Sequence, residues 1–294
     1  MKILNLKLNE PITINEPIAA CIGYFDGLHL GHQALINQTK DLAVNNGIKT
    51  CLITFNPDPH NILEGQTFKH IESFDERLKL IEGFGFDYCL ILNFNQTMAD
   101  LSVEAFYDQI LSHLPLKYLV CGFDFHYGYK GQGNYETLTS QAKNNFEVIK
   151  IDSVNYLGQK ISSSRIRHAI LEGDLKLASE LLGYQYTLTG QVIHGRALGR
   201  EIGYPTANLE IDAEVLLPKC GVYLGYAVHN DNRYRAMISI GNNPTVKDNL
   251  QPTVEVHLLD FNEDIYQKTI KLEVNEWLRP IIQFDSMADL KKQL

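Results

Sequence analysis

Two histidines, His29 and His32, stand three residues apart in the segment Gly23-Tyr-Phe-Asp-Gly-Leu-His-Leu-Gly-His. A helical pattern starts near His29, and residues three apart on a helix share one face. At the start of a helix, the unpaired backbone N–H groups and the positive dipole end favour a bound anion. Glycines let the backbone approach a ligand closely, and imidazoles can donate hydrogen bonds to phosphate oxygens. This pattern indicates a site that holds a nucleotide during attack at phosphorus.

Three further segments of the first half combine polar, glycine and proline residues at junctions of predicted elements. They are Thr54–Pro59, Gly122–Gly128 and Ser162–Arg167. Each lies between a strand and a helix, so all three could converge on one crevice. Serines before a helix are good N-caps and phosphate donors, and Arg165 can balance developing negative charge. A plain helix cap is the simpler interpretation of Ser162–Ser164, and the lone His126 is equally consistent with a surface histidine.

In the second half, a Gly-rich loop and an alternating strand carry the candidate residues. The loop runs from Gly195 to Asn208, and long ordered loops are usually functional. Its Thr206 and Asn208 offer neutral oxygens suited to Mg²⁺ or phosphate. In the strand Thr253–Leu259, Glu255 lies on the face opposite the apolar residues, and a carboxylate aimed into a cleft can act as a general base. A solvent-facing glutamate on a half-buried strand is the alternative.

The elements that must position the first-half residues alternate between strands and helices. The predicted strands are Ile18–Ile22, Lys49–Phe55, Tyr88–Leu92, Tyr118–Cys121 and Phe146–Ile149. The helical patterns between them are His29–Asn46, Phe74–Gly83, Ser102–Leu114 and Tyr135–Asn144. This alternation predicts an α/β domain with a Rossmann-like parallel sheet covered on both faces. Ligands of such sheets bind beyond the carboxyl ends of the strands, which is where His29 and His32 follow the first strand.

The pattern changes near Gly183. Helical patterns at Ser163–Glu172 and Leu175–Leu182 close the first part, for which we predict a domain over residues 1–183. The predicted strands beyond it are Thr187–Ile193, Val222–His229, Tyr234–Ile240, Thr253–Leu259 and Thr269–Val274. Strands joined by Gly, Asn, Asp and Pro turns predict an all-β antiparallel barrel or sandwich over residues 184–294.

Composition narrows the class of protein. A net charge of −9 argues against a nucleic-acid-coating surface, so a phosphorylated ligand must be met by local groups. The five cysteines form no C-x-x-C pair, and four of them sit in apolar strand-like runs. Reduced buried thiols are typical of a reducing compartment. Because Met1–Pro17 has no apolar signal core and no apolar run approaches bilayer length, we expect a cytoplasmic protein.

These residues together resemble the prokaryotic bifunctional riboflavin kinase/FMN adenylyltransferase (FAD synthetase) family, over nearly the whole chain. In the first half the motifs Gly-x-Phe-Asp-Gly-x-His-x-Gly-His, Thr-Phe-x-Pro-x-Pro and Ser-Ser-x-Arg-Ile-Arg recur in order. The resemblance implies a nucleotidyltransferase domain that adenylylates FMN to FAD with release of pyrophosphate. His29, His32 and Arg165 would be its catalytic residues. The implied nucleotide-binding residues are Gly23, Phe25, Asp26, Gly31, Ser162 and Ser163, and the implied flavin-binding residues are Asn56, Pro57 and Asp124.

In the second half the family motif Gly-Arg-x-x-Gly-x-Pro-Thr-Ala-Asn stands intact from Gly199 to Asn208, and Glu255-Val-His-Leu-Leu-Asp-Phe follows. The resemblance implies a flavokinase barrel that phosphorylates riboflavin to FMN. Glu255 would activate the ribityl hydroxyl, while Thr206 and Asn208 would hold Mg²⁺ with ATP. Gly199 and Pro205 would bind the nucleotide and Arg279 the flavin. The implied partners are riboflavin, FMN, FAD and ATP, without nucleic acid or membrane, in a monomer or weak oligomer with Mg²⁺ as cofactor.

The departures from the family pattern concentrate in the first half. His126 stands where the family usually has Arg, and Asn134 stands where Asp is common. Tyr24 replaces a frequent Asn, Asp58 a common His, and Ser164 a Thr. The two nearly complete motif sets make a bifunctional enzyme the leading hypothesis. The departures at His126 and Asn134 support the second hypothesis, a kinase with a weak or silent adenylyl module. A flavin-binding regulator without turnover is a third, against which the intact Glu255 argues because binding alone needs no general base.

Overall fold

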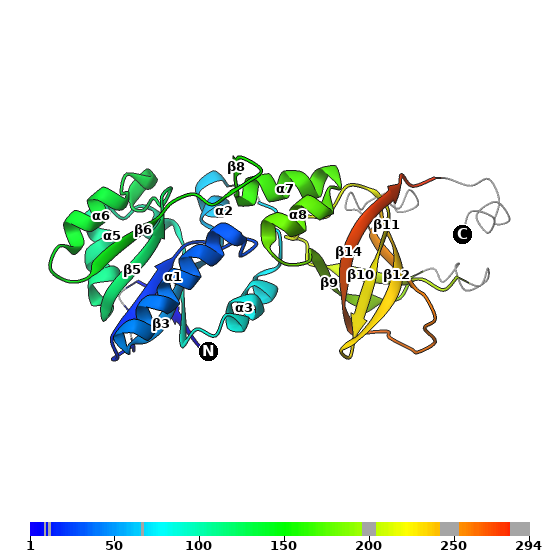
Figure 1. Cartoon of the computed structure of the whole chain (residues 1–294), viewed down its shortest axis with the longest axis horizontal. Coiled ribbons are helices and arrows are strands. Elements are labelled where there is room, and N and C mark those ends of the chain that lie inside the picture. Colours follow the sequence, from blue (N-terminus) through cyan, green and yellow to red (C-terminus); the bar gives the residue numbers. More distant parts are fainter. Residues whose placement is uncertain (9, 11–12, 66–67, 196–203, 242–252, 283–294) are drawn as a thin grey trace. The chain divides into compact units, whose positions relative to one another are not determined.

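The computed structural model describes the chain except for residues 9, 11–12, 66–67, 196–203, 242–252 and 283–294 (Figure 1). Its contacts divide the chain into two compact units. The first unit comprises residues 1–69 and 74–162, and the second comprises residues 70–73 and 163–294. The predicted fold class, a parallel sheet followed by an antiparallel barrel, is confirmed.

The first unit is built on one parallel sheet of six strands. Their order across the sheet is β1 (Lys2–Leu6), β4 (Tyr88–Asn93), β3 (Lys49–Asn56), β2 (Ile18–Ile22), β5 (Leu116–Gly122) and β6 (Glu147–Ile151). Every residue of the central β2 is buried, as its unbroken apolar run requires in a sheet covered on both faces. The five predicted strands are confirmed to within about two residues. The edge strand β1 was missed, because an edge strand with three exposed residues out of five carries little apolar signal.

Helices cover both faces of this sheet (Figure 1). On one face, α1 (Leu30–Asn46) and α3 (Phe74–Gly83) pack on a core that includes Phe25, Leu28 and Val120. On the other face, α5 (Val103–Gln109) and α6 (Tyr135–Ala142) cover a second core. The predicted helix over residues 102–114 is too long, because the backbone leaves helical geometry at Ile110 and only a 3₁₀ turn follows.

Short elements at the strand ends were not predicted. They are α2 (Pro59–Glu64), α4 (Gln96–Ala99), a 3₁₀ turn at Tyr129–Gly131, and the hairpin β7 (Asn155–Tyr156) with β8 (Gln159–Lys160). None is long enough to show a hydrophobic period, which is why the sequence pattern gives no sign of them.

The strand order creates a topological switch point at β2 and β5. These two strands are neighbours, but β2 leads into α1 on one face of the sheet and β5 leads toward α6 on the other. The connections therefore diverge beyond the carboxyl ends of the two strands, which is the position at which ligands of such sheets bind. The turn from Gly23 to His29 leaves β2 at this point.

The second unit combines two helices with a closed antiparallel barrel. The helices are α7 (Ser163–Glu172) and α8 (Leu175–Leu182). Around the barrel the order is β10 (Ala207–Ile211), β13 (Thr253–Leu258), β12 (Asn232–Gly241), β11 (Gly221–His229), β14 (Thr269–Arg279) and β9 (Thr187–Ile193). The start of β10 was wrongly predicted as loop, because only Leu209 and Ile211 interrupt its polar residues. Both helices belong by their contacts to this unit, so the boundary at residue 183 stays a prediction.

The join between α8 and the barrel is short. Gly183 ends α8 in the left-handed conformation with φ 78°, a position that favours glycine. The backbone N–H of Tyr186 then donates to Ser179 Oγ at 3.0 Å, and β9 begins at the next residue.

All five cysteines are free, and Cys21, Cys51, Cys89 and Cys121 are buried, as the sequence pattern predicts. Burial raises the pKa of Cys21 and Cys121 to about 12, so these thiols stay protonated and unreactive at neutral pH. Within the described part of the chain, no helix combines the length and the apolar character that a bilayer crossing requires.

Candidate functional site

His29 and His32 form one stacked pair at the start of α1. His29 is the N-cap residue, and its Nδ1 accepts the backbone N–H of His32 at 3.2 Å. The two rings lie 3.6 Å apart between centroids and are nearly parallel, at 12°. Because Nδ1 of His29 accepts a hydrogen bond, a neutral ring carries its proton on Nε2. The cap therefore fixes a donor nitrogen of the kind that a phosphate oxygen needs.

The turn before the helix is unusual in its backbone. Phe25, Gly27 and Leu28 all have positive φ, at 62°, 82° and 34°. Only the glycine adopts such angles without steric cost, so the two other residues need support from their surroundings. Phe25 and Leu28 are fully buried, and the Leu28 N–H donates to the Phe25 carbonyl at 3.2 Å. The packing of Phe25 and Leu28 thus stabilises this backbone conformation, which places His29 at the start of α1.

His32 is neutral at pH 7. Burial, together with the nearby charges of His29 and Arg77, holds the pKa of His32 well below its ordinary value of 6.5. Its Nδ1 is buried without a hydrogen-bond partner among the described residues. Phe25 contacts its ring edge-on at a centroid distance of 5.2 Å.

Two glycines of this segment, Gly23 and Gly31, leave little room for a side chain. A Cβ on Gly31 would lie 3.0 Å from two ring atoms of His29, and one on Gly23 would lie 3.3 Å from the Phe25 ring. Asp26, between them in the turn, is also buried. The predicted nucleotide-binding residues Gly23, Phe25, Asp26 and Gly31 therefore belong to the same compact turn as the histidine pair.

The predicted flavin-binding residues of the first unit lie at the carboxyl ends of β3 and β5, the two strands that flank β2. Asn56 ends β3, and the Asn56–Pro57 peptide bond is cis. Asp124 lies two residues beyond β5 and forms an ion pair with Lys160 at 2.6 Å. The Lys160 ammonium also lies 4.4 Å from the centroid of the Phe123 ring. The sequence reasoning missed Lys160, because no local motif marks a lysine that reaches 36 residues back along the chain.

The two main departures from the family pattern have local structural contacts. His126 is exposed, and its Nδ1 lies 3.0 Å from the Gly131 carbonyl oxygen. Asn134 is the N-cap of α6 and forms a full capping box with Thr137. An aspartate would cap this helix equally well, so the helix start does not explain why the chain carries asparagine there.

The remaining first-half candidates lie at the start of α7. Ser162 is the last residue of the first unit, whereas Ser163 and Arg165 belong to α7 in the second unit. Their assignment to the phosphate side of the adenylyl reaction stays a prediction.

In the second unit, Asn208 and Glu255 are direct partners across neighbouring strands. Asn208 of β10 pairs in register with Glu255 of β13, which in turn pairs with Ser239 of β12. Residues directly opposite in an antiparallel pair share one face with Cβ atoms about 5 Å apart. These three half-buried polar residues therefore form a row across the outer face of the barrel. Sequence reasoning missed Ser239, because only the strand register brings it to Glu255.

Burial raises the pKa of Glu255 above its ordinary value of 4.5. Along β13, Glu255 and its neighbours Thr253 and His257 are half-buried, while Val254, Val256 and Leu258 are buried inside the barrel. This alternation confirms the predicted facing of the strand. A carboxylate with a raised pKa is more basic, which favours the role of general base.

The chain before β10 is held close to this row. The Pro205 carbonyl oxygen lies 2.7 Å from Nδ1 of His257, and the ring of His257 contacts Tyr204 edge-on. At Gly195, a Cβ would lie 1.9 Å from the amide nitrogen of Asn208, so a side chain at this position would displace the Asn208 amide. Gly199, a predicted nucleotide-binding residue, lies outside the described residues.

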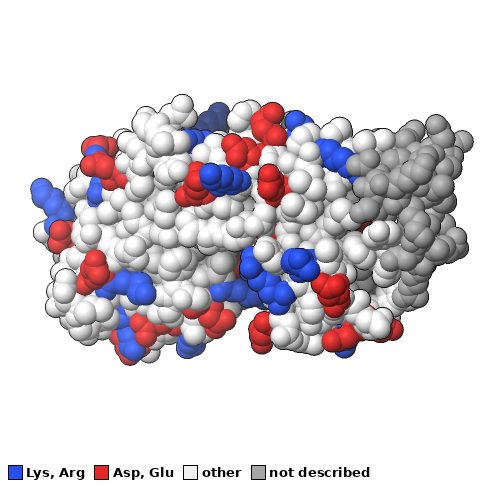
Figure 2. Space-filling view, turned by 45° about the vertical axis from the view of Figure 1, so that its right-hand side comes forward, with Lys and Arg blue, Asp and Glu red and all other residues white. Residues whose placement is uncertain are grey.

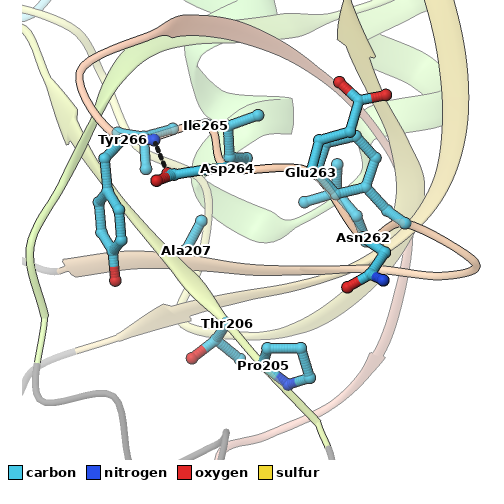
Figure 3. A pocket seen from close by; sticks show the side chains of 11 residues that line it. Pro205, Thr206, Ala207, Asn262, Glu263, Asp264, Ile265 and Tyr266 are labelled. Atoms are coloured by element: carbon cyan, nitrogen blue, oxygen red, sulfur yellow. Dashed lines mark hydrogen bonds between the residues drawn. The ribbon is translucent and has the colours of Figure 1, made fainter.

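A cavity of about 420 Å³ opens beside the start of β10. In Figure 3, Pro205 and Thr206 line one side of it, and the segment from Asn262 to Tyr266 lines the other. The Tyr266 N–H donates to Asp264 Oδ1 at 3.0 Å, which folds this segment back on itself. The predicted residues Pro205 and Thr206 thus share a pocket, which the sequence alone did not reveal.

Arg279, the predicted flavin-binding residue, is the last residue of β14 and is half-buried. It pairs in register with Val222 of β11, and its Nη1 donates to the Pro280 carbonyl at 3.1 Å. On the face drawn in Figure 2, acidic and basic side chains of the described residues are interspersed in small groups among uncharged residues.

Comparisons with known proteins agree with both units. A family model described as FAD synthetase matches residues 12–165, and a model described as riboflavin kinase matches residues 182–294. The bifunctional riboflavin kinase/FMN adenylyltransferase of Listeria monocytogenes is 38% identical, over 98% of this chain and 93% of that protein. The protein of the same description from Bacillus subtilis is 35% identical, over 93% of this chain and 88% of its own.

A solved structure described as a macrolide-efflux protein from Streptococcus pneumoniae aligns with 100% of this chain and 96% of its own. Its TM-score is 0.91 at 34% sequence identity. The family models and the relatives named above, each aligned over nearly its full length, identify the family independently of that description. The chain belongs to the bifunctional riboflavin kinase/FMN adenylyltransferase family.

Proposed function

We propose that this chain phosphorylates riboflavin to FMN with ATP at the row formed by Ser239, Glu255 and Asn208, and adenylylates FMN to FAD with ATP at the His29–His32 turn. Family membership supports both activities. The single observation that carries the kinase half is the register that pairs Asn208 with Glu255. It brings an oxygen ligand and a carboxylate base from motifs 47 residues apart to adjacent positions.

In the kinase reaction, the Glu255 carboxylate accepts the proton of the ribityl hydroxyl while that oxygen bonds to the γ-phosphorus of ATP, and ADP leaves. Glu255 suits this role because burial makes it more basic than an ordinary glutamate. Phosphoryl transfer requires mostly positioning and charge neutralisation. The 420 Å³ cavity beside Thr206 is large enough to hold part of the nucleotide.

The residues near Glu255 fit a magnesium ion that is shared with the substrate. Mg²⁺ prefers oxygen ligands and is usually bound by one or two protein groups together with substrate phosphates. Thr206, directly before β10, supplies a hydroxyl, and Asn208, the second residue of β10, supplies an amide oxygen. When bound there, the ion would neutralise charge on the transferred phosphoryl group.

In the adenylyl reaction, a phosphate oxygen of FMN attacks the α-phosphorus of ATP, and pyrophosphate leaves as that bond forms. His29 and His32 act as hydrogen-bond donors to phosphate oxygens, and the start of α1 adds its backbone N–H groups. Ser162, Ser163 and Arg165 are assigned to the phosphates, and Asn56, Pro57 and Asp124 to the flavin. In the kinase unit, Arg279 is assigned to the flavin and Gly199 with Pro205 to the nucleotide.

A kinase with a weak or silent adenylyl module is the second candidate. The specific observation in its favour is that His126 stands in place of the usual arginine and that its Nδ1 lies 3.0 Å from the Gly131 carbonyl oxygen. This segment therefore lacks the permanent positive charge that an arginine would offer to an anionic ligand.

A paired assay separates the two candidates. Purified protein with ATP and Mg²⁺ is supplied with riboflavin in one series and with FMN in the other, and the flavins are separated by chromatography. We expect FMN and then FAD in the first series and FAD in the second. No FMN from riboflavin would refute the kinase assignment, and no FAD from FMN would leave only the second candidate.

The pH dependence of FMN formation follows from Glu255. A base must be ionised to accept a proton, so the rate is lost as the pH falls through the raised pKa of this carboxyl group. We expect kcat/KM for riboflavin to fall about tenfold per pH unit on an acid limb whose midpoint lies above 4.5. FAD formation from FMN by the same protein should lack this limb. A midpoint at or below the ordinary glutamate value would contradict the assignment.

We further propose a cytoplasmic location, supported by the four buried free thiols, and a monomer or weak oligomer.

A further inference from the structure

Arg77 is a buried arginine in the first unit. It lies on α3 with only 3% of its surface exposed, although arginines are rarely buried without a paired charge. Arg77 forms no ion pair with any residue that the structure describes, and its Nε has no hydrogen-bond partner there. Burying a charge without a paired opposite charge is costly, so the presence of this arginine calls for a role other than stability.

The guanidinium of Arg77 contacts the turn that carries the histidine pair. Its Nη1 donates to the Tyr24 carbonyl oxygen at 3.0 Å, and Thr54 Oγ1 donates to the same oxygen at 3.0 Å. Its central carbon lies 4.1 Å from the centroid of the Tyr24 ring and 4.9 Å from that of Phe74. Arg77 is therefore held between two aromatic rings with one donor committed to the turn.

The carbonyl that Arg77 binds stands next to the strained part of the turn. Tyr24 precedes Phe25, the first of the residues with positive φ, and His29 follows five residues after Tyr24. Two hydrogen bonds to this carbonyl fix the orientation of the Tyr24 peptide plane, which directly precedes the first residue with positive φ. The charge of Arg77 also reaches the other end of the turn, since it contributes to the low pKa of His32.

We propose that Arg77 is a positioning residue for adenylyl transfer, which holds the Tyr24 peptide so that the His29–His32 pair meets the phosphates in a fixed orientation. The inference rests on the proposed adenylyl reaction at that pair. In this proposal Arg77 does not contact the reacting atoms, and it affects the histidine pair only by holding the turn before them. Its loss should therefore reduce transition-state stabilisation more than ground-state binding, which lowers kcat and leaves KM nearly unchanged.

The test compares Arg77→Met, which removes the charge and the donor, with Arg77→Lys, which keeps both. Lys79→Met on the same helix is the matched control, because the Lys79 side chain is 68% exposed and pairs only with Glu76 in the described structure. Steady-state kcat and KM for FMN and ATP are measured for FAD formation, and FMN formation from riboflavin is measured on the same preparations as a check on folding.

We expect Arg77→Met to lower kcat for FAD formation at least tenfold, with KM and FMN formation within about twofold of wild type. Arg77→Lys should recover part of that loss, and Lys79→Met should match wild type. An Arg77→Met rate within twofold of wild type, or equal losses in Met and Lys, overturns the proposal. If Arg77→Met loses both activities through misfolding, Arg77→Lys decides: a partial loss of kcat for FAD formation with unchanged KM and intact FMN formation supports the role, and an unchanged kcat or parallel losses of both activities refute it. Wild type unable to make FAD would instead refute the proposed function.

Discussion

Glu255→Gln lowers kcat for FMN formation by on the order of a thousandfold, while FAD formation from supplied FMN stays within about twofold of wild type. Glutamine keeps the shape of the side chain and its place in the row with Asn208 and Ser239, but it cannot accept the ribityl proton. The residual rate should lose the acid limb that wild type shows, because no carboxyl group remains to be titrated. Steady-state kinetics with each flavin, across the acid range, provide the measurement.

The matched control is Glu210→Gln on the neighbouring strand β10. Glu210 is exposed and stands two residues from Asn208, so the substitution changes the same charge on the same side of the barrel wall. We expect it to leave both activities unchanged. Equal losses in the two variants would mean that net charge, rather than a proton acceptor at Glu255, controls the rate.

His29→Asn should lower FAD formation at least a hundredfold and leave FMN formation from riboflavin unchanged. Asparagine is a good N-cap, so it can still accept the His32 N–H, but it lacks the imidazole nitrogen that we propose donates to a phosphate oxygen. Removing one preorganised donor to a transition-state oxyanion costs about a hundredfold to a thousandfold in kcat. The measurement is pyrophosphate release with FMN and ATP.

Two companions separate chemistry from helix capping. His29→Ala removes both the donor and the cap, so it should add a stability loss of about 1 kcal/mol to the same kinetic defect. Ser102→Ala removes the N-cap of α5, whose Oγ accepts the Ala105 N–H, and should show the stability loss without the kinetic defect. If His29→Asn also slows FMN formation, the two sites are not independent.

The fold could be predicted for the elements whose apolar residues, by their spacing alone, indicate a strand or a helix. The five apolar runs of the sheet and the alternation of β13 are buried as their patterns require. The edge strand β1 could not be recognised, because it is buried on too few positions to leave a pattern. The start of β10 was predicted as loop because it directly follows a glycine-rich segment. Its strand conformation is defined mainly by pairing with β9 and β13.

Residues of the candidate sites could be predicted only when they belong to a local sequence motif. His29 is marked by its position after a buried strand and before a helix, and its stacking on His32 follows from that spacing. Ser239, Lys160 and Arg77 reach their sites through strand register or across tens of residues, so no sequence window contains the information. Their recognition needs the three-dimensional fold.

The strand register at Glu255 also governs which substitutions the chain can accumulate. A slip of one residue in β13 would turn Glu255 inward and expose Val254 and Val256, so a shift of register at the proposed kinase site would also open the barrel. The register that brings these residues together is thus maintained by the requirement to fold. The adenylyl segments lie in turns and caps, where His126 and Asn134 are accommodated by local hydrogen bonds without loss of core. That half therefore accepts His126 and Asn134 with its scaffold intact.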